Sequence, residues 1–442
     1  MEILAKVGKA LQQLFGSLAE HAAVASGVIQ RKRKFTGVSL CKTFVLGFLQ
    51  NPEASDEELA QIAAQCGTPV TPQAIEQRHT PRMVKFLETL FRQATKLVIG
   101  SDRSLAPILE RFSSVPVLDS SAFRLPDSMK EQFPGCGGSH GGGVAAIKLQ
   151  TELDLRSGAL QHIEIEAGRR TDGATCRQSV RRGEGSLRIS DLGYFNVAVF
   201  AEMVAAKEHF LSRLQFGTGV MLRTGQEVKL LSWLASQPGP FVDQPILLSK
   251  EHRLPCRLIA WRLPEEQANR RRQKLRREML NKCGKEPSAE RLAWCDWTIL
   301  VTSVPAEMLS PEEAAILYRA RWQVELLLKR WKSQDLVAVL SGSTEVRQMV
   351  RVWSRLLAAL VQHWIVVASA WGDPTKSLSK VCEAVRSFTG RTAAALPRLE
   401  ELIRVLSDIC SAIATTCRRN KRAKPGTFEL LNDARLLEFC LT

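Results

Sequence analysis

The stretch that decides the fold runs from Ser310 to Lys332 and reads SPEEAAILYRARWQVELLLKRWK. Its first residues form a helix start, because Ser310 can cap the helix, Pro311 suits the first helical position and Glu313 completes a Ser-x-x-Glu capping box. Strong helix formers follow, and neither glycine nor proline interrupts them before Lys332. The sequence therefore predicts one continuous helix over residues 310–332.

This predicted helix has two distinct faces. At about 100° per residue, one apolar stripe collects Leu317, Ala320, Val324, Leu328 and Trp331. An arc of about 60° beside it collects Tyr318, Arg321, Glu325 and Lys332. A carboxylate with two cations and a phenol suits a helix that holds a metal ion and contacts phosphate groups. The alternative is a solvated face on which Glu325 pairs with basic neighbours.

Two aspartates upstream follow short apolar stretches. The stretch 114–118 (SVPVL) predicts a strand that stops at Asp119, and residues 185–191 (GSLRISD) predict a second strand ending in Asp191. Between them, residues 144–168 alternate as a hairpin that turns at 156–158, and a helix after Asp191 leads to a fifth strand over 210–214. The pattern alone indicates a mixed α/β fold; either aspartate could also be an ordinary turn residue.

With both aspartates in place, the spacing Tyr318-x2-Arg321-x3-Glu325-x6-Lys332 resembles the Tyr-Arg-Glu-Lys signature of DDE transposases in insertion-sequence family four. The resemblance implies a ribonuclease-H-like catalytic core, a mixed sheet with flanking helices, in which Asp119, Asp191 and Glu325 bind two Mg²⁺ ions, with Mn²⁺ as a substitute. It further implies that Tyr318, Arg321, Lys332 and Arg213 contact DNA. Leu192 departs from the family pattern, which more often has a basic residue there.

The resemblance also implies a β-rich insertion, here residues 216–297. Residues 270–277 of this insertion (RRRQKLRR) place six cations in eight positions and predict a basic helix. Arg270, Arg271, Arg272 and Lys274 are candidates for phosphate contacts, although a solvated charged helix would look the same. Trp297 closes the segment and is a candidate for stacking on a flipped base, whereas core packing is the ordinary role of a tryptophan.

The predicted organisation has five segments. They are a helical DNA-binding region at 1–100, the first core part at 101–215, the insertion at 216–297, the second core part at 298–340 and a helical region at 341–442. Within the first segment, residues 55–79 have the helix–turn–helix outline of many DNA-binding domains, which any helical bundle can also produce. The last segment carries no catalytic signature, and in similar proteins such a region helps to pair two subunits.

Composition supports a DNA partner. The chain has 442 residues with a formal net charge of +16, which favours a polyanionic ligand. Eleven scattered cysteines without a Cys-x-x-Cys pair predict a reduced, intracellular protein. The resemblance to transposases of bacterial insertion sequences implies the bacterial cytoplasm, near the nucleoid. The most apolar run, 356–371, contains Gln362 and His363 and is too short to span a membrane. No nucleotide-binding P-loop is present.

These observations predict a DNA transposase that cleaves phosphodiesters at element ends and transfers the 3′-OH into target DNA. The expected partners are double-stranded DNA, as terminal inverted repeats and target, and a second copy of the chain in a homodimer on that DNA. Two alternatives remain. One is a catalytically silent, sequence-specific transposase remnant that only binds DNA, and the other is a ribonuclease-H-like nuclease that only hydrolyses it.

Overall fold

The computed structural model describes residues 2–30, 34–136, 144–333, 344–420 and 426–432 of the chain. These residues form two compact units, each built from separate stretches of sequence. Unit 1 comprises residues 1–105, 119–170 and 324–421, and unit 2 comprises 106–118, 171–323 and 422–442. The basic residues 31–33 and the glycine-rich stretch 137–143 lie outside the described residues.

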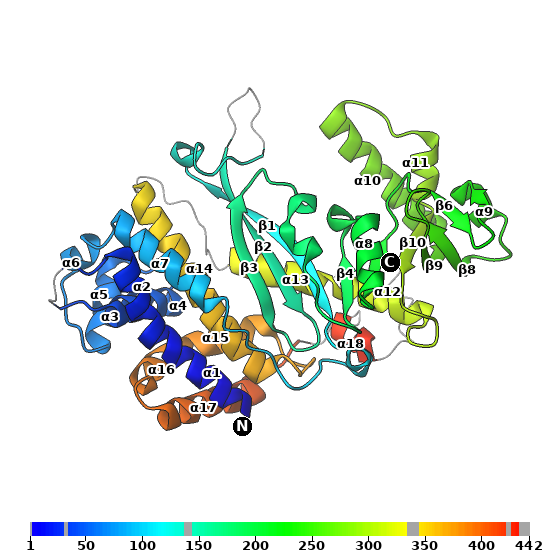
Figure 1. Ribbon diagram of the computed structural model, residues 1–442. Coiled ribbons are helices and arrows are strands. Elements are labelled where there is room, and N and C mark those ends of the chain that lie inside the picture. Colours follow the sequence, from blue (N-terminus) through cyan, green and yellow to red (C-terminus); the bar gives the residue numbers. More distant parts are fainter. Residues whose placement is uncertain (1, 31–33, 137–143, 334–343, 421–425, 433–442) are drawn as a thin grey trace. The chain divides into compact units, whose positions relative to one another are not determined.

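Unit 1 is mainly helical, and helices from both ends of the chain pack side by side in it (Figure 1). Its α-helices are α1 (Glu2–Gln13), α2 (Ala19–Ser26), α3 (Gly37–Cys41), α4 (Gly47–Gln50), α5 (Asp56–Gln65), α6 (Pro72–Glu76), α7 (Pro81–Ala94), α14 (Glu345–Ala370), α15 (Leu378–Ser387), α16 (Thr389–Ala395) and α17 (Leu399–Thr416). A capping box formed by Ser55 and Glu58 begins α5. The helical character expected of both terminal regions is therefore confirmed.

Helix α14 forms the centre of unit 1. It packs against α1, α7, α15 and α17, and most of its side chains are buried. The apolar run noted at 356–371 is thus part of a longer helix, and by length and composition α14 could cross a membrane. However, 89% of its most apolar window is buried inside the protein, which is typical of a core helix.

The predicted hairpin is confirmed in unit 1. Strands β2 (Ala145–Asp154) and β3 (Leu160–Ala167) pair antiparallel, with Thr151 opposite Ile163. Gly158 in the turn has φ +75° and faces the Trp371 ring, so a side chain there would be strained and would clash. The strand order in this unit is β3-β2-β1.

Strand β1 (Pro116–Leu125) contributes residues to both units. Contrary to the prediction, it does not stop at Asp119 but continues for six residues beyond it. Burial changes at this point, since Pro116, Val117 and Leu118 are buried and Asp119 is only partly buried. Asp119 is therefore held on a regular strand and not on a turn.

Unit 2 contains the strand order β1-β4-β5-β10-β9-β8-β6-β7. The strands that it adds to β1 are β4 (Leu187–Ser190), β5 (His209–Arg213), β6 (Val220–Leu222), β7 (Glu227–Val228), β8 (Phe241–Leu248), β9 (Leu254–Arg262) and β10 (Trp297–Thr302). Strands β1, β4 and β5 are parallel, whereas β10 joins β5 antiparallel. This mixed α/β architecture confirms the predicted fold class.

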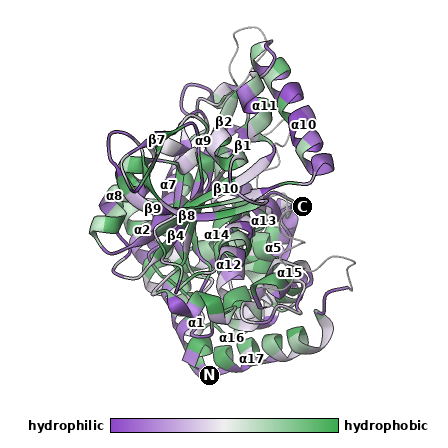
Figure 2. Cartoon of the chain, turned by 90° about the vertical axis from the view of Figure 1, so that its right-hand side faces the viewer, coloured by the Kyte–Doolittle hydropathy of each residue, from purple (hydrophilic) through white to green (hydrophobic). Residues whose placement is uncertain are grey.

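The helices of unit 2 include the basic helix of the insertion. They are α8 (Val197–Ala205), α9 (Leu230–Ala235), α10 (Glu265–Cys283), α11 (Ala289–Trp294), α12 (Pro311–Ala320) and α18 (Thr427–Asn432). Figure 2 shows α10 largely in hydrophilic colours, and Ala268 is its one buried residue among those described. The predicted strands and basic helix between β5 and β10 are therefore present.

The helix expected over 310–332 is instead two helices, α12 and α13 (Trp322–Ser333), which meet at Arg321. Arg321 keeps helical dihedral angles, with φ −47° and ψ −35°, but its N–H bonds the Tyr318 carbonyl and not that of Leu317. The predicted apolar stripe is confirmed at each of its positions, from Leu317 (0% exposed) to Trp331 (3%). The capping box at Ser310 is also present.

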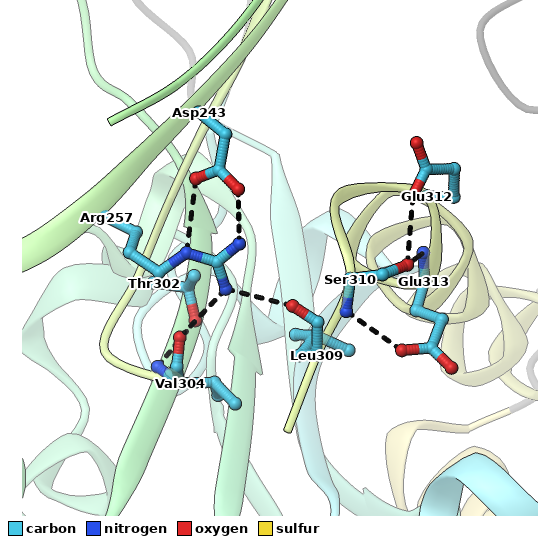
Figure 3. A network of polar contacts seen from close by, with 8 residues as sticks. All are labelled: Asp243, Arg257, Thr302, Val304, Leu309, Ser310, Glu312 and Glu313. Atoms are coloured by element: carbon cyan, nitrogen blue, oxygen red, sulfur yellow. Dashed lines mark hydrogen bonds and ion pairs between the residues drawn. The ribbon is translucent and has the colours of Figure 1, made fainter. Parts of the chain in front are cut away.

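A polar network fixes the start of α12 (Figure 3). Arg257 on β9 donates two hydrogen bonds to the Asp243 carboxylate, at 3.2 and 2.6 Å, and one each to the carbonyls of Val304 and Leu309. In the next residue, the Ser310 N–H donates to the Glu313 carboxylate, and the Ser310 hydroxyl accepts the Glu313 N–H. The Glu313 carboxylate also accepts hydrogen bonds from both terminal nitrogens of Arg111. The insertion strands thereby hold the loop from which the signature helix begins.

Candidate catalytic site

Asp191 lies where β4 ends. The parallel register pairs Ser190 with Ser212, so the next residues, Asp191 and Arg213, lie side by side on neighbouring strands. Asp191 is also the N-terminal flanking residue of a short 3₁₀ turn (Leu192–Tyr194), and its carbonyl accepts the Tyr194 N–H at 3.0 Å. The prediction of a strand that ends in Asp191 is confirmed, and the carboxylate is partly buried.

Around Asp191, unit 2 contains a cavity of about 210 Å³. Five of the predicted site residues line it, namely Asp191, Arg213, Arg271, Tyr318 and Arg321. The remaining lining residues are Thr298, Leu300, Ala315, Arg319 and Trp322. Four guanidinium groups therefore surround one carboxylate, and the cavity has a strong excess of positive charge.

Two of these arginines, Arg213 and Arg321, contact the ring of Tyr318. The guanidinium carbons of Arg213 and Arg321 lie 5.8 and 5.9 Å from the ring centroid, within the range of cation–π contacts. Burial raises the pKa of the Tyr318 phenol, and the negative charge of Asp191 raises it further. The positive charges of Arg213 and Arg321 lower this pKa, but the net shift is upward. The phenol is consequently protonated at neutral pH and can donate a hydrogen bond into the cavity.

Arg271 enters the same cavity from the basic helix α10. Its side chain is only partly exposed, and it donates to the Trp297 carbonyl at 3.3 Å. Burial lowers the pKa of the Arg271 guanidinium to about 10, with a further contribution from Arg213. The other three candidates on α10 are paired with acids: Arg270 with Glu266, Arg272 with Glu265 and Asp296, and Lys274 with Glu278.

Glu325 and Lys332 lie on α13 in unit 1. The Glu325 carboxylate is partly buried and pairs with Lys329 one turn later, at 2.8 Å. The exposed Lys332 places its ammonium 5.1 Å from the centroid of the Phe123 ring, so the end of α13 lies against β1. Asp119, four residues before Phe123 on that strand, accepts the Ser120 N–H at 2.8 Å.

The triad is thus distributed over both units, with Asp119 and Glu325 in unit 1 and Asp191 in unit 2. Within the part of the chain that the structure describes, no group of three or more His, Cys, Asp or Glu side chains is positioned to hold a metal ion. The three residues supply only carboxylate oxygens, which are the ligands that Mg²⁺ and Mn²⁺ prefer. Their chemistry fits such ions.

Trp297 is buried, with 7% of its surface exposed, and it packs in the core cluster of unit 2 with Ile299 and Val301. Stacking on a base would require it to leave this core, so its burial favours a packing role. Trp294, three residues earlier, is half-buried and meets the Phe216 ring edge-on, with ring centroids 5.3 Å apart. Trp322, which was not among the predicted residues, is 48% exposed at the cavity, and its exposure could not be read from the sequence.

Comparison with known proteins identifies a family. Residues 110–361, more than half of the chain, match the family model described as transposase DDE domain. The transposase for insertion sequence element IS231B of Bacillus thuringiensis subsp. berliner is 27% identical over 375 residues, which cover 79% of this chain and 77% of that protein. The transposase for IS1151 of Clostridium perfringens is 25% identical over 379 residues, covering 78% and 76%. A putative transposase, InsL for IS186A of Escherichia coli (strain K12), is 36% identical over 115 residues, covering 26% and 31%.

Proposed function

The chain belongs to the transposase DDE domain family, and from this premise we propose that Asp119, Asp191 and Glu325 are the three carboxylates of its catalytic centre. It is a transposase of an insertion-sequence element and therefore acts on DNA. The Tyr-Arg-Glu-Lys spacing supports its assignment to insertion-sequence family four. The bacterial relatives and the DNA substrate support a place for its activity at the nucleoid in the bacterial cytoplasm.

The reaction that we assign is cleavage of phosphodiesters at the element ends, followed by transfer of the resulting 3′-OH into target DNA. Two Mg²⁺ ions, replaceable by Mn²⁺, would be held by Asp119, Asp191 and Glu325 and would supply activation of the attacking oxygen and stabilisation of the leaving oxygen. The observation that carries the proposal is the cationic cavity beside Asp191, because a family aspartate next to four arginines is suited to a phosphate-containing substrate.

The residues around Asp191 would orient the substrate. Arg213 and Arg321 present planar forks that match phosphate oxygens, and Tyr318, which lies between them, can donate one hydrogen bond. Lys332, exposed at the end of α13, would contact a phosphate as a point charge. For Trp297 we propose core packing in place of base stacking, because of its burial.

The exposed face of α10 offers a second surface for DNA. Arg270 and Lys274 expose most of their side chains, while Arg272 is held by Glu265 and Asp296. We assign these three cations to sequence-independent contacts with the DNA backbone. To make these contacts, each cation would leave its carboxylate partner for a phosphate group, at little cost in free energy. The helical region after residue 341 is our candidate for the contact between two subunits on DNA.

The experiment that tests the function uses labelled duplexes with the ends of the element, incubated with the protein and Mg²⁺. Strand-transfer products are expected. Nicked DNA without transfer would favour the hydrolysis-only nuclease, and bound but uncut DNA would favour the silent remnant; either result would contradict the proposed function. Replacement of Mg²⁺ by Ca²⁺ or chelation by EDTA is the control for metal dependence.

A further inference from the structure

The basic helix α10 does not use all its cations in the same way. Arg270 exposes 75% of its side chain and pairs with Glu266, as expected for a residue on a solvated surface. Arg271, the next residue, turns inward, is only partly exposed and lines the cavity beside Asp191. Adjacent positions on a helix point about 100° apart, so one of the two can face the cavity while the other faces solvent.

The cavity contains polar groups without a hydrogen-bond partner. Arg321 Nε and Thr298 Oγ1 are both buried and unsatisfied in the described structure. A buried donor without a partner costs roughly 1–3 kcal/mol, so native sites that contain one are usually completed by a ligand or by water. Arg271 makes one hydrogen bond, to the Trp297 carbonyl, and a guanidinium group has five N–H donors.

From these contacts we propose that Arg271 is a phosphate-binding residue of the Asp191 cavity, where it holds one DNA phosphodiester together with Arg321 and Thr298. The inference rests on the proposed function and deepens it, because it assigns a residue of the insertion to the site and not to the exposed surface of α10. The cavity, at about 210 Å³, has room for a phosphate group and several waters, each of which takes about 30 Å³ in the liquid. The partly buried forks of the two arginines match the tetrahedral oxygens of such a group.

The test measures binding and not cleavage. A fluorescein-labelled duplex of random sequence is titrated with the whole protein in EDTA at several salt concentrations. Arg271→Gln is expected to weaken binding roughly tenfold and to lower the slope of log K against log salt by about one, because one charge-assisted phosphate contact is lost. Arg270→Gln is the comparison from the adjacent position: as a separate, solvent-exposed contact on α10 it is expected to weaken binding by less than about threefold.

The decisive readout is the coupling to Arg321. If Arg271 and Arg321 hold the same phosphate, the loss in Arg271→Gln/Arg321→Gln is smaller than the product of the single losses by at least about threefold. The pair Arg270→Gln/Arg321→Gln is expected to be additive within about twofold. Additive behaviour of Arg271, or an unchanged affinity, would overturn the inference.

Two controls keep the result interpretable. Should Arg271→Gln fail to fold, Arg271→Lys keeps the cation without the fork and is expected to bind about threefold more weakly with an unchanged salt slope; unchanged affinity would again overturn the inference. The outcome is also independent of catalysis. A protein that binds DNA with this coupling but produces no cleavage with Mg²⁺ would contradict the proposed function and leave the inference intact.

Discussion

Glu325 has two possible roles, as the partner of Lys329 in a surface ion pair and as a ligand of a metal ion. Its 2.8 Å pair with Lys329 is the ordinary one-turn support of a surface helix, and Lys329 keeps 56% of its side chain exposed. Such a pair contributes only a few tenths of a kcal/mol, so it leaves the carboxylate available for a metal ion at almost no cost. Ion pairing and metal binding are therefore compatible at this position.

Glu325→Gln is expected to reduce cleavage of end-containing duplexes on the order of a thousandfold or more, because a metal ligand loses its charge. Binding of the same duplexes should change by less than about threefold, since affinity for DNA comes mainly from cations. Gel-based cleavage and anisotropy measure the two effects separately. Glu400→Gln, an exposed glutamate in unit 1, is the matched control. An equal loss of binding and cleavage would assign Glu325 a structural role.

His363 makes stability depend on pH. It lies in the middle of α14, donates to the Gly158 carbonyl at 2.8 Å, and has its pKa lowered to about 4 by burial, with Arg330 acting in the same direction. Since the ordinary pKa is 6.5, the unfolded chain takes up a proton before the folded chain does, and stability falls as pH decreases from about 6.5 towards 4.

The expected loss between these two pH values is about 3 kcal/mol from this group. His363→Gln keeps a donor near the Gly158 carbonyl but cannot titrate, so its unfolding free energy should vary less between pH 7 and pH 4 than that of the native protein. Urea unfolding of both proteins at several pH values measures the difference. Parallel pH profiles for the two proteins would show that His363 does not carry this dependence.

At the scale of elements, the sequence indicated most helices and strands but not where the signature helix breaks. Nothing between Ser310 and Lys332 has a low helix propensity of the kind that glycine or proline has, so local preference favours one helix. The two helices meet at Arg321, whose N–H bonds the Tyr318 carbonyl and whose side chain lines the cavity. Tertiary contacts of this kind are not visible in a propensity pattern.

Strand β1 presents the reverse case. Asp119, Ser120 and Ser121 are residue types that favour turns, and they suggested that the strand ends. Pairing with β2 in unit 1 instead carries the strand through them to Leu125. Asp119 could thus be chosen as a candidate from its position in the sequence. That it lies within a continuous strand could not be predicted in the same way. The contribution of Arg271 to the cavity was equally hidden, because a run of six cations gives no sign of which one turns inward.

The hydrogen bonds of Arg257 hold the loop before α12, so their loss is expected to lower the stability of the protein. Arg257→Gln removes the partner of Asp243 and the donor for two carbonyls at a site where only 11% of the arginine side chain is exposed. We expect a loss of about 3 kcal/mol in stability, as for other mostly buried pairs broken on one side. Thermal and urea unfolding measure it. Arg262→Gln, at the exposed end of the same strand, should change stability by less than about 0.5 kcal/mol; equal effects would contradict the assigned role.

At the scale of the whole molecule, the three carboxylates that we propose for the catalytic centre come from both compact units, and each unit is assembled from distant parts of the chain. The two-unit division differs in kind from the five segments expected from sequence, which remain a prediction. The compact units group residues that are neighbours in space, whereas composition and motifs follow the order of the chain. The net charge of +16 belongs to this scale as well, because long-range attraction for DNA sums over the entire surface.

The central claim is that Asp119, Asp191 and Glu325 share one metal centre. The most direct test replaces Mg²⁺ with Fe²⁺ in the DNA-bound protein and adds ascorbate and peroxide. Hydroxyl radicals formed at the bound ion then cut the polypeptide backbone next to it. The account predicts three sets of peptide fragments, with ends near residues 119, 191 and 325, all suppressed by excess Mg²⁺ and all lost together in Asp191→Asn. Cuts near only one of the three, or cuts at 119 and 325 that persist in Asp191→Asn, would contradict it.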